Sequence, residues 1–108
     1  MDENLQKTEF KESFGEVNTP YKLADQMISL FHEEFFIDPN NKWLDPGCGQ
    51  GNISWRLFSK LRQYHEPNYI LKEMIQMIEI NKEREMDVKN LFKEYTESPN
   101  LSITNYLQ

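Results

Sequence analysis

The chain has 108 residues and a formal net charge of -6, from 18 acidic and 12 basic side chains. This length allows one small domain, and an acidic balance is atypical of a free-standing nucleic-acid binder. The apolar runs are too short to span a membrane. A single cysteine excludes an internal disulfide framework, and this cysteine with two distant histidines is an unsuitable set of ligands for a local zinc site. The start lacks the pattern of a secretory signal peptide, so we expect a cytoplasmic protein with no metal and no membrane partner.

The first strong structural signal is a helix start near residue 19. Residues 1–17 are polar and lack clear periodicity, so we expect a flexible lead-in, with a domain over residues 18–108. Thr19 is a good N-cap, and Pro20 suits the first helical position because its missing N–H has no partner there. Apolar residues then follow helical spacing, which predicts a helix from Pro20 to about Phe36.

The remaining elements alternate between strand and helix. Their predicted bounds are a strand at 42–45, a helix from 51 or 52 to about 64, a strand at 75–80, a helix at 82–95 and a strand at 101–107. The stretch Tyr69–Met74 is ambiguous and fits a short helical turn. This alternation predicts an α/β fold with a parallel sheet, a partial Rossmann-like fold of three strands that forms half of a doubly wound sheet.

A glycine-rich turn follows the first predicted strand. Gly47, Gly49 and Gly51 allow positive φ and close approach of a ligand to the backbone. Their spacing is G-x-G-x-G, and Asn52 takes the third position of the dinucleotide fingerprint G-x-G-x-x-G; no G-K-S/T is present, which excludes a P-loop. Asp45, directly before the turn, would repel a pyrophosphate but suits the ammonium of S-adenosylmethionine, which has no phosphate.

A second acid and several alternatives complete this part of the sequence. Glu79 falls at the end of the second strand, where a carboxylate can accept hydrogen bonds from two ribose hydroxyls. An ordinary turn is the alternative interpretation of the glycines taken alone. Cys48 fits a packing residue better than a nucleophile, because no histidine lies near it in sequence, and His32 and His65 fit surface or helix-end positions.

Three blocks of this sequence resemble adenine-specific (N6) DNA methyltransferases of restriction–modification type, which occur in bacteria and large DNA viruses. Residues 15–20 resemble the N-terminal motif G-E-V-x-T-P, residues 43–52 resemble the cofactor loop x-L-D-P-x-C-G-x-G-N, and residues 77–82 resemble the ribose-binding strand end. The resemblance implies a methyltransferase fold that binds S-adenosylmethionine. The cofactor-binding positions it implies are Thr19, Asp45, Pro46, Gly47, Cys48, Gly49, Gly51, Asn52, Glu79, Ile80 and Asn105.

The resemblance also assigns individual roles. Thr19 would help to hold the methionine carboxylate, and Asp45 would contact the methionine amine. Glu79 would bind the ribose hydroxyls, and Ile80 would pack on the adenine ring. Asn105 stands where the family has an Asp that binds the adenine amine, which implies a weakened contact.

One block of the family pattern is missing from these 108 residues. The catalytic tetrapeptide (N/D/S)-P-P-(Y/F), which contacts the flipped adenine, does not occur, so no catalytic residue is assigned and we expect a fold truncated before that motif. The resemblance implies that DNA is the substrate of the complete enzyme, and we expect this chain alone to bind DNA weakly. A second chain could supply the catalytic motif. The alternatives are a non-catalytic S-adenosylmethionine-binding module, a subunit of a split enzyme, or part of a methyltransferase acting on RNA or a protein glutamine.

Overall fold

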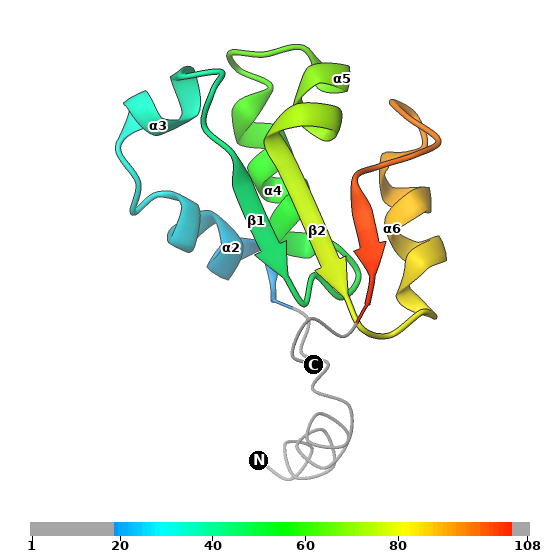
Figure 1. Cartoon of the computed structure of the whole chain (residues 1–108). Coiled ribbons are helices and arrows are strands. Elements are labelled where there is room, and N and C mark those ends of the chain that lie inside the picture. The colour runs from blue at the N-terminus through cyan, green and yellow to red at the C-terminus, as the bar shows by residue number, and fades with distance from the viewer. Residues whose placement is uncertain (1–18, 105–108) are drawn as a thin grey trace, which may run out of the picture.

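The computed structural model describes residues 19–104 of the chain. The elements in chain order are α2 (Tyr21–Ile28), α3 (Glu33–Ile37), β1 (Trp43–Pro46), α4 (Asn52–Leu61), α5 (Pro67–Tyr69), the π-helical turn η1 (Ile70–Met74), β2 (Ile75–Glu79), α6 (Arg84–Phe92) and β3 (Leu101–Ile103) (Figure 1). The predicted lead-in, the Gly15–Asn18 block, Asn105 and the last part of the predicted final strand lie outside the described residues.

The three strands form one parallel sheet in the order β1-β2-β3. In the register of the sheet, Trp43 lies beside Ile75 and Met77 lies beside Leu101. The helices that connect consecutive strands lie between them in sequence, as a parallel sheet requires. The predicted α/β fold with a parallel sheet is therefore confirmed.

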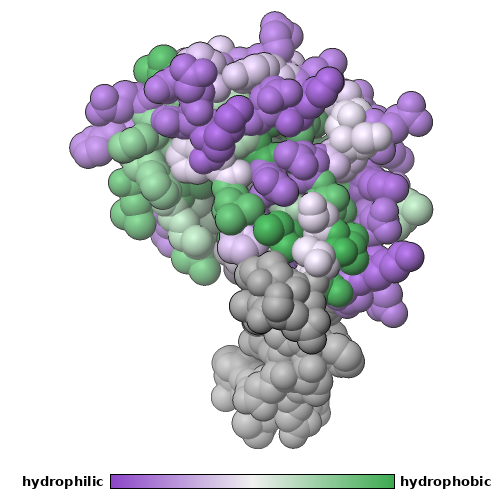
Figure 2. Space-filling model, in the orientation of Figure 1, coloured by the Kyte–Doolittle hydropathy of each residue, from purple (hydrophilic) through white to green (hydrophobic). Residues whose placement is uncertain are grey.

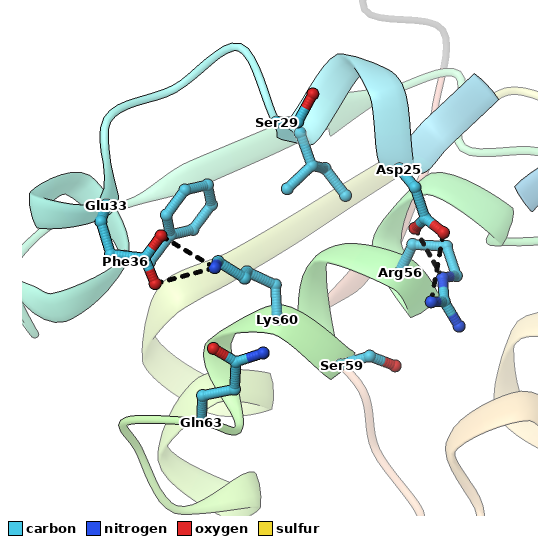
Figure 3. A pocket seen from close by; sticks show the side chains of 9 residues that line it. Asp25, Ser29, Glu33, Phe36, Arg56, Ser59, Lys60 and Gln63 are labelled. Carbon is cyan, nitrogen blue, oxygen red and sulfur yellow. Dashed lines mark hydrogen bonds and ion pairs between the residues drawn. The ribbon is translucent and has the colours of Figure 1, made fainter. Parts of the chain in front are cut away.

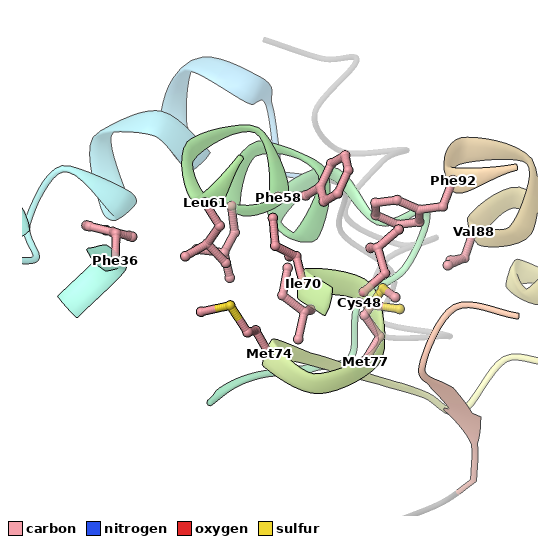
Figure 4. Close-up of a cluster of buried hydrophobic side chains, with 12 residues drawn as sticks. Phe36, Cys48, Phe58, Leu61, Ile70, Met74, Met77, Val88 and Phe92 are labelled. Atoms are coloured by element: carbon pink, nitrogen blue, oxygen red, sulfur yellow. The ribbon is translucent and has the colours of Figure 1, made fainter. Parts of the chain in front are cut away.

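One face of the sheet is covered by helices and carries the core. Phe58 of α4 meets Phe92 of α6 edge to face, with ring centroids 5.5 Å apart. Met77 of β2 and the π-helical turn pack against the same cluster (Figure 4). Buried apolar side chains from strand, turn and helices thus form one continuous core, which fixes the ends of β1 and β2 relative to α4.

The opposite face of the sheet has no helix among residues 19–104. Leu44 on β1 is 60% exposed, and its neighbour Gln76 on β2 is also exposed. Apolar side chains of α2 and α3 add to this surface, and green patches over these helices and the front of the sheet are visible in Figure 2. Parallel sheets usually bury both faces, so half of this sheet is left uncovered by the described chain.

The predicted single helix over Pro20–Phe36 is wrong, because the structure divides it into α2 and α3. The segment between them brings Phe31 edge to face with Trp43, with ring centroids 5.2 Å apart. Phe36 of α3 stacks on the same indole, also at 5.2 Å and with ring planes only 10° apart. A straight helix would not direct both rings at one tryptophan, so packing against β1 outweighs the helical periodicity of the segment.

Other predicted boundaries shift by smaller amounts. Pro20 is the N-cap of α2 rather than its first residue, and no side chain caps this helix end. The ambiguous segment is α5 followed by η1, as a helical turn was expected there. Helix α6 is shorter at both ends than predicted, and β3 ends at Ile103, before a bend at Thr104. None of the helices in the described part has the length and apolar character needed to cross a membrane.

Candidate functional site

The glycine turn joins the carboxyl end of β1 to the start of α4. Gly47, Gly49 and Gly51 have φ values of 71°, 58° and 93°, and no other residue between 19 and 104 has a positive φ. Three left-handed residues within five positions turn the chain sharply from strand to helix. Residues with a side chain adopt this conformation only at a cost, which explains why glycine occupies all three positions.

Hydrogen bonds from β2 hold this loop in place. The backbone N–H groups of Gly47 and Cys48 both donate to the carbonyl oxygen of Ile78, at 2.6 and 2.9 Å. The next residue of β2, Glu79, accepts the N–H of Gly49 at 2.7 Å through Oε1. Its other oxygen accepts the N–H of Asn81 at 2.8 Å. Glu79 is only 4% exposed, so its carboxylate connects the strand end to the loop from a buried position.

The carboxylate of Asp45 lies at the end of β1 and is 8% exposed. Its Oδ2 accepts a hydrogen bond from the hydroxyl of Ser54 at 2.6 Å. Burial raises the pKa of Asp45, the hydroxyl and backbone N–H of Ser54 oppose that rise, and the nearby charge of Glu79 adds to it. Two buried acids thus flank the loop, and no basic side chain from residues 19–104 forms an ion pair with Asp45.

The segment before α2 reaches the same loop. Asn52, the first residue of α4, donates from its side-chain amide to the carbonyl oxygen of Thr19 at 2.8 Å. The structure therefore brings together four of the predicted positions that are distant in sequence: Thr19, Asp45, Asn52 and Glu79. They surround the loop at the carboxyl ends of β1 and β2, where open α/β sheets bind their ligands.

The remaining predicted positions differ in exposure. Pro46 is exposed and Ile80 is half exposed directly after β2, so both are accessible beside the loop. Cys48 is buried in the core, and burial, with the charges of Asp45 and Glu79, raises the pKa of its thiol to about 12. A thiol that stays protonated among apolar side chains is a packing residue, as the sequence indicated. No group of ligands suited to a metal occurs among the described residues.

The surroundings of the glycines test whether a ligand fits. A methyl group placed on Gly47 would meet no atom within 4 Å, so the space above this residue is open. A methyl group on Gly51 would come within 2.9 Å of the Leu91 side chain, so this glycine packs against α6. The first glycine therefore leaves room for a ligand beside Asp45, while the last one fixes the loop to the core.

Sequence reasoning missed Ser54. The buried face of α4 contains Ser54, Leu57, Phe58 and Leu61, and the polar Ser54 is not among the site residues predicted from the sequence. Ser54 is the first residue in the i, i+3, i+4, i+7 spacing of that face, and this spacing is the sequence pattern that indicates its burial. A polar residue at a core position of a helix needs a partner, and here the partner is Asp45.

A separate hollow of about 430 Å³ lies between α2, α3 and α4. Two ion pairs border it, Arg56–Asp25 at 2.8 Å and Lys60–Glu33 at 2.8 Å, as Figure 3 shows. No residue of the glycine loop lines this hollow. Its basic groups already have acidic partners, so the arrangement provides no unpaired charge for a ligand, and the loop remains the candidate site.

Comparison with known proteins agrees with this fold. No protein-family model and no curated protein sequence matches the chain. Among solved structures, it is similar to the crystal structure of an S-adenosylmethionine-dependent methyltransferase from Clostridium acetobutylicum ATCC 824, with a TM-score of 0.56 and 16% sequence identity. The match covers 97% of this chain and 38% of that one. The likeness confirms a Rossmann-like fold. The chain spans a little over a third of the length of that methyltransferase.

Proposed function

We propose that this chain is the S-adenosylmethionine-binding portion of a methyltransferase. The observation that carries the proposal is the pair of buried carboxylates, Asp45 and Glu79, on either side of a loop with three left-handed glycines. The loop lies at the strand ends where nucleoside ligands bind in folds of this class. The similar fold of an S-adenosylmethionine-dependent methyltransferase supports the same ligand.

Charge favours this cofactor over the phosphate-containing alternatives. A dinucleotide or ATP brings negative phosphates to the loop, and two buried carboxylates would repel them. S-adenosylmethionine brings an ammonium and a sulfonium, both positive. A cation beside Asp45 would also offset the unfavourable burial of that carboxylate.

Each residue then has a proposed role toward the cofactor, whose sulfonium supplies the methyl group. Asp45 would pair with the ammonium, and the backbone of the open Gly47 would allow close approach. Each oxygen of Glu79 accepts one backbone N–H and keeps capacity for a ribose hydroxyl. Ile80 would pack on the adenine ring. From the resemblance, we also propose that Asn105 contacts the adenine amine weakly and that Thr19 contacts the methionine carboxylate.

The finer proposal is methylation of adenine N6 in DNA. Its support is the resemblance of residues 15–20 and 43–52 to that family, and the hydrogen bond that joins Thr19 to Asn52 across the two blocks. These 108 residues contain no (N/D/S)-P-P-(Y/F) tetrapeptide. We therefore propose that another polypeptide segment provides it and pairs with the outer edge of β1, where no strand from residues 19–104 lies and Leu44 is exposed. The isolated chain is then a cofactor-binding subunit without methyl transfer of its own.

Titration calorimetry of the wild-type chain with S-adenosylmethionine, NADH and ATP tests the proposal. We expect S-adenosylmethionine to bind best. Asp45→Asn and Glu79→Gln should each weaken it about ten- to hundredfold, because each removes a buried charged hydrogen-bond partner. Glu94→Gln, at an exposed position just after α6, is the control and should leave the affinity unchanged. Tighter binding of NADH or ATP, or equal affinity of wild type and Asp45→Asn, would contradict the proposal.

A further inference from the structure

Ser54 occupies an unusual position for a serine in a helix. It is the third residue of α4 and is fully buried on the face that packs against the sheet. Its hydroxyl donates to Oδ2 of Asp45 at 2.6 Å, across the glycine loop from helix to strand. A hydrogen bond of this length to a carboxylate belongs to the strong, charge-assisted class.

The second serine of α4 provides a contrast within the same helix. The hydroxyl of Ser59 donates to the carbonyl oxygen of Trp55, four residues earlier, at 2.9 Å. This bond to the preceding turn is the usual one for a helical serine. Ser54 instead contacts a strand residue nine positions earlier, in the proposed cofactor site.

We infer that Ser54 is a positioning residue, which holds the Asp45 carboxylate in the orientation that receives the cofactor's ammonium group. This inference rests on the function proposed above. Asp45 directs Oδ2 toward the hydroxyl of Ser54, and the carboxylate as a whole is 8% exposed rather than fully enclosed. A fixed carboxylate loses no rotamer freedom when the ligand arrives, which favours tight binding.

The electrostatics of the site give Ser54 a second effect. The described groups that bear on Asp45 are the Glu79 carboxylate at the end of β2, the Cys48 thiol in the loop, and the Ser54 hydroxyl and N–H from α4. Burial and Glu79 raise the pKa of Asp45, whereas the bonds from Ser54 lower it. Without the hydroxyl, Asp45 would remain protonated and neutral to a higher pH. A neutral carboxyl group attracts an ammonium far less than a carboxylate does.

The test compares two ligands, only one of which carries the ammonium. S-adenosylmethionine has a sulfonium and an amino acid portion with an ammonium and a carboxylate, whereas 5′-methylthioadenosine keeps the adenine and ribose, has a neutral thioether sulfur and lacks the amino acid portion. At neutral pH, Ser54→Ala should weaken binding of S-adenosylmethionine about tenfold, the effect of one charged hydrogen bond, and leave 5′-methylthioadenosine nearly unchanged. In the same variant, the pH at which affinity for S-adenosylmethionine is half lost should move upward.

Matched variants separate positioning from folding. Ser59→Ala removes the other α4 hydroxyl and should leave both affinities and the pH profile unchanged. Ser54→Cys keeps the approximate volume and a weak donor, so it should fall between wild type and Ser54→Ala, and it replaces Ser54→Ala if that variant does not fold. Equal S-adenosylmethionine affinity in the wild type and these Ser54 variants, or equal loss of both ligands, would overturn the inference. A wild-type chain that binds neither ligand would overturn the proposed function itself.

Discussion

Gly47 and Gly51 share a left-handed backbone but differ in what surrounds them. Gly47 has a φ of 71° with open space above it, and Gly51 has a φ of 93° with Leu91 directly against it. An alanine at either position suffers backbone strain. Only at Gly51 would the new methyl group also overlap a neighbouring side chain. Comparing alanine variants at the two positions therefore distinguishes the effect of backbone strain from the effect of steric overlap.

Gly47→Ala should lower the free energy of unfolding by about 1–2 kcal/mol, from backbone strain alone. Gly51→Ala should cost about 1 kcal/mol more, because the Leu91 side chain has to move. Urea unfolding monitored by circular dichroism measures both values. The order should reverse for cofactor binding in the folded variants, since the methyl group at Gly47 enters the ligand's space. Equal losses of stability would show that Leu91 does not restrict position 51.

Asp45 also makes stability depend on pH. Because its pKa in the folded chain lies above the ordinary 3.8, the folded state holds this proton more tightly than the unfolded state. The stabilisation from that proton is present below the unfolded pKa and is lost as pH rises through the folded pKa. The difference in unfolding free energy between the wild type and Asp45→Asn should therefore move in favour of the variant as the pH rises above 3.8. A difference that stays constant across this range in urea titrations would contradict the raised pKa.

Some site residues were predictable from sequence and others were not. The loop glycines, Asp45 and Glu79 follow from strand context and chemistry, since an acid beside a glycine turn at a strand end is a local pattern. The hydrogen bonds from the N–H of Gly49 to the Glu79 carboxylate and from the Asn52 amide to the carbonyl of Thr19 join residues 30 and 33 positions apart. Such pairs depend on how α4 packs on the sheet, which no local pattern specifies.

At the scale of elements, the break between α2 and α3 shows where periodicity fails. The apolar residues from Ala24 to Phe35 fit one helix, and periodicity alone does not reveal that Trp43 accepts two aromatic partners. The alternation of strand and helix was predictable because each element has its own apolar pattern and turn residues. The predicted helix breaks where Phe31 and Phe36 both contact Trp43, a residue that lies beyond the helix in the sequence.

The stacking of Phe36 on Trp43 predicts a contrast between neighbouring phenylalanines. Phe36→Ala should lower the free energy of unfolding by about 3–5 kcal/mol, because a fully buried ring is lost and a cavity remains. Phe35→Ala, at a position that is 44% exposed, should cost less than about 1 kcal/mol. Chemical denaturation of the two variants measures both. Similar losses would mean that α3 does not anchor on β1 through Phe36.

At the scale of the whole molecule, residues 19–104 leave one face of the sheet and the edge of β1 uncovered. The parallel fold was predictable from the order of elements, and so was the half-complete sheet. The exposed apolar surface formed by α2, α3 and Leu44 was not predictable, because the burial of each side chain depends on which helices pack against it. An uncovered parallel sheet of this kind supports the proposal that another polypeptide segment completes the domain.

The charge of the whole chain predicts weak binding to DNA. A net charge of -6 provides no long-range attraction to phosphates, so we expect binding only at low salt and without sequence preference. Fluorescence anisotropy with labelled duplexes of different sequence, in about 50 and about 200 mM salt, measures this. A salt-resistant, sequence-dependent complex would show that the chain itself carries a recognition surface.

The concentration of glycine in the loop has a practical consequence for spectroscopy. The sequence contains four glycines, and Gly47, Gly49 and Gly51 are three of them. Selective labelling of glycine with nitrogen-15 should thus give a nuclear magnetic resonance spectrum in which most amide signals come from the loop. The amide of Gly47 reports on its bond to β2, that of Gly49 on the Glu79 carboxylate, and that of Gly51 on the turn through its bond to Cys48. A small-molecule library can therefore be screened directly against the loop with three signals as the readout.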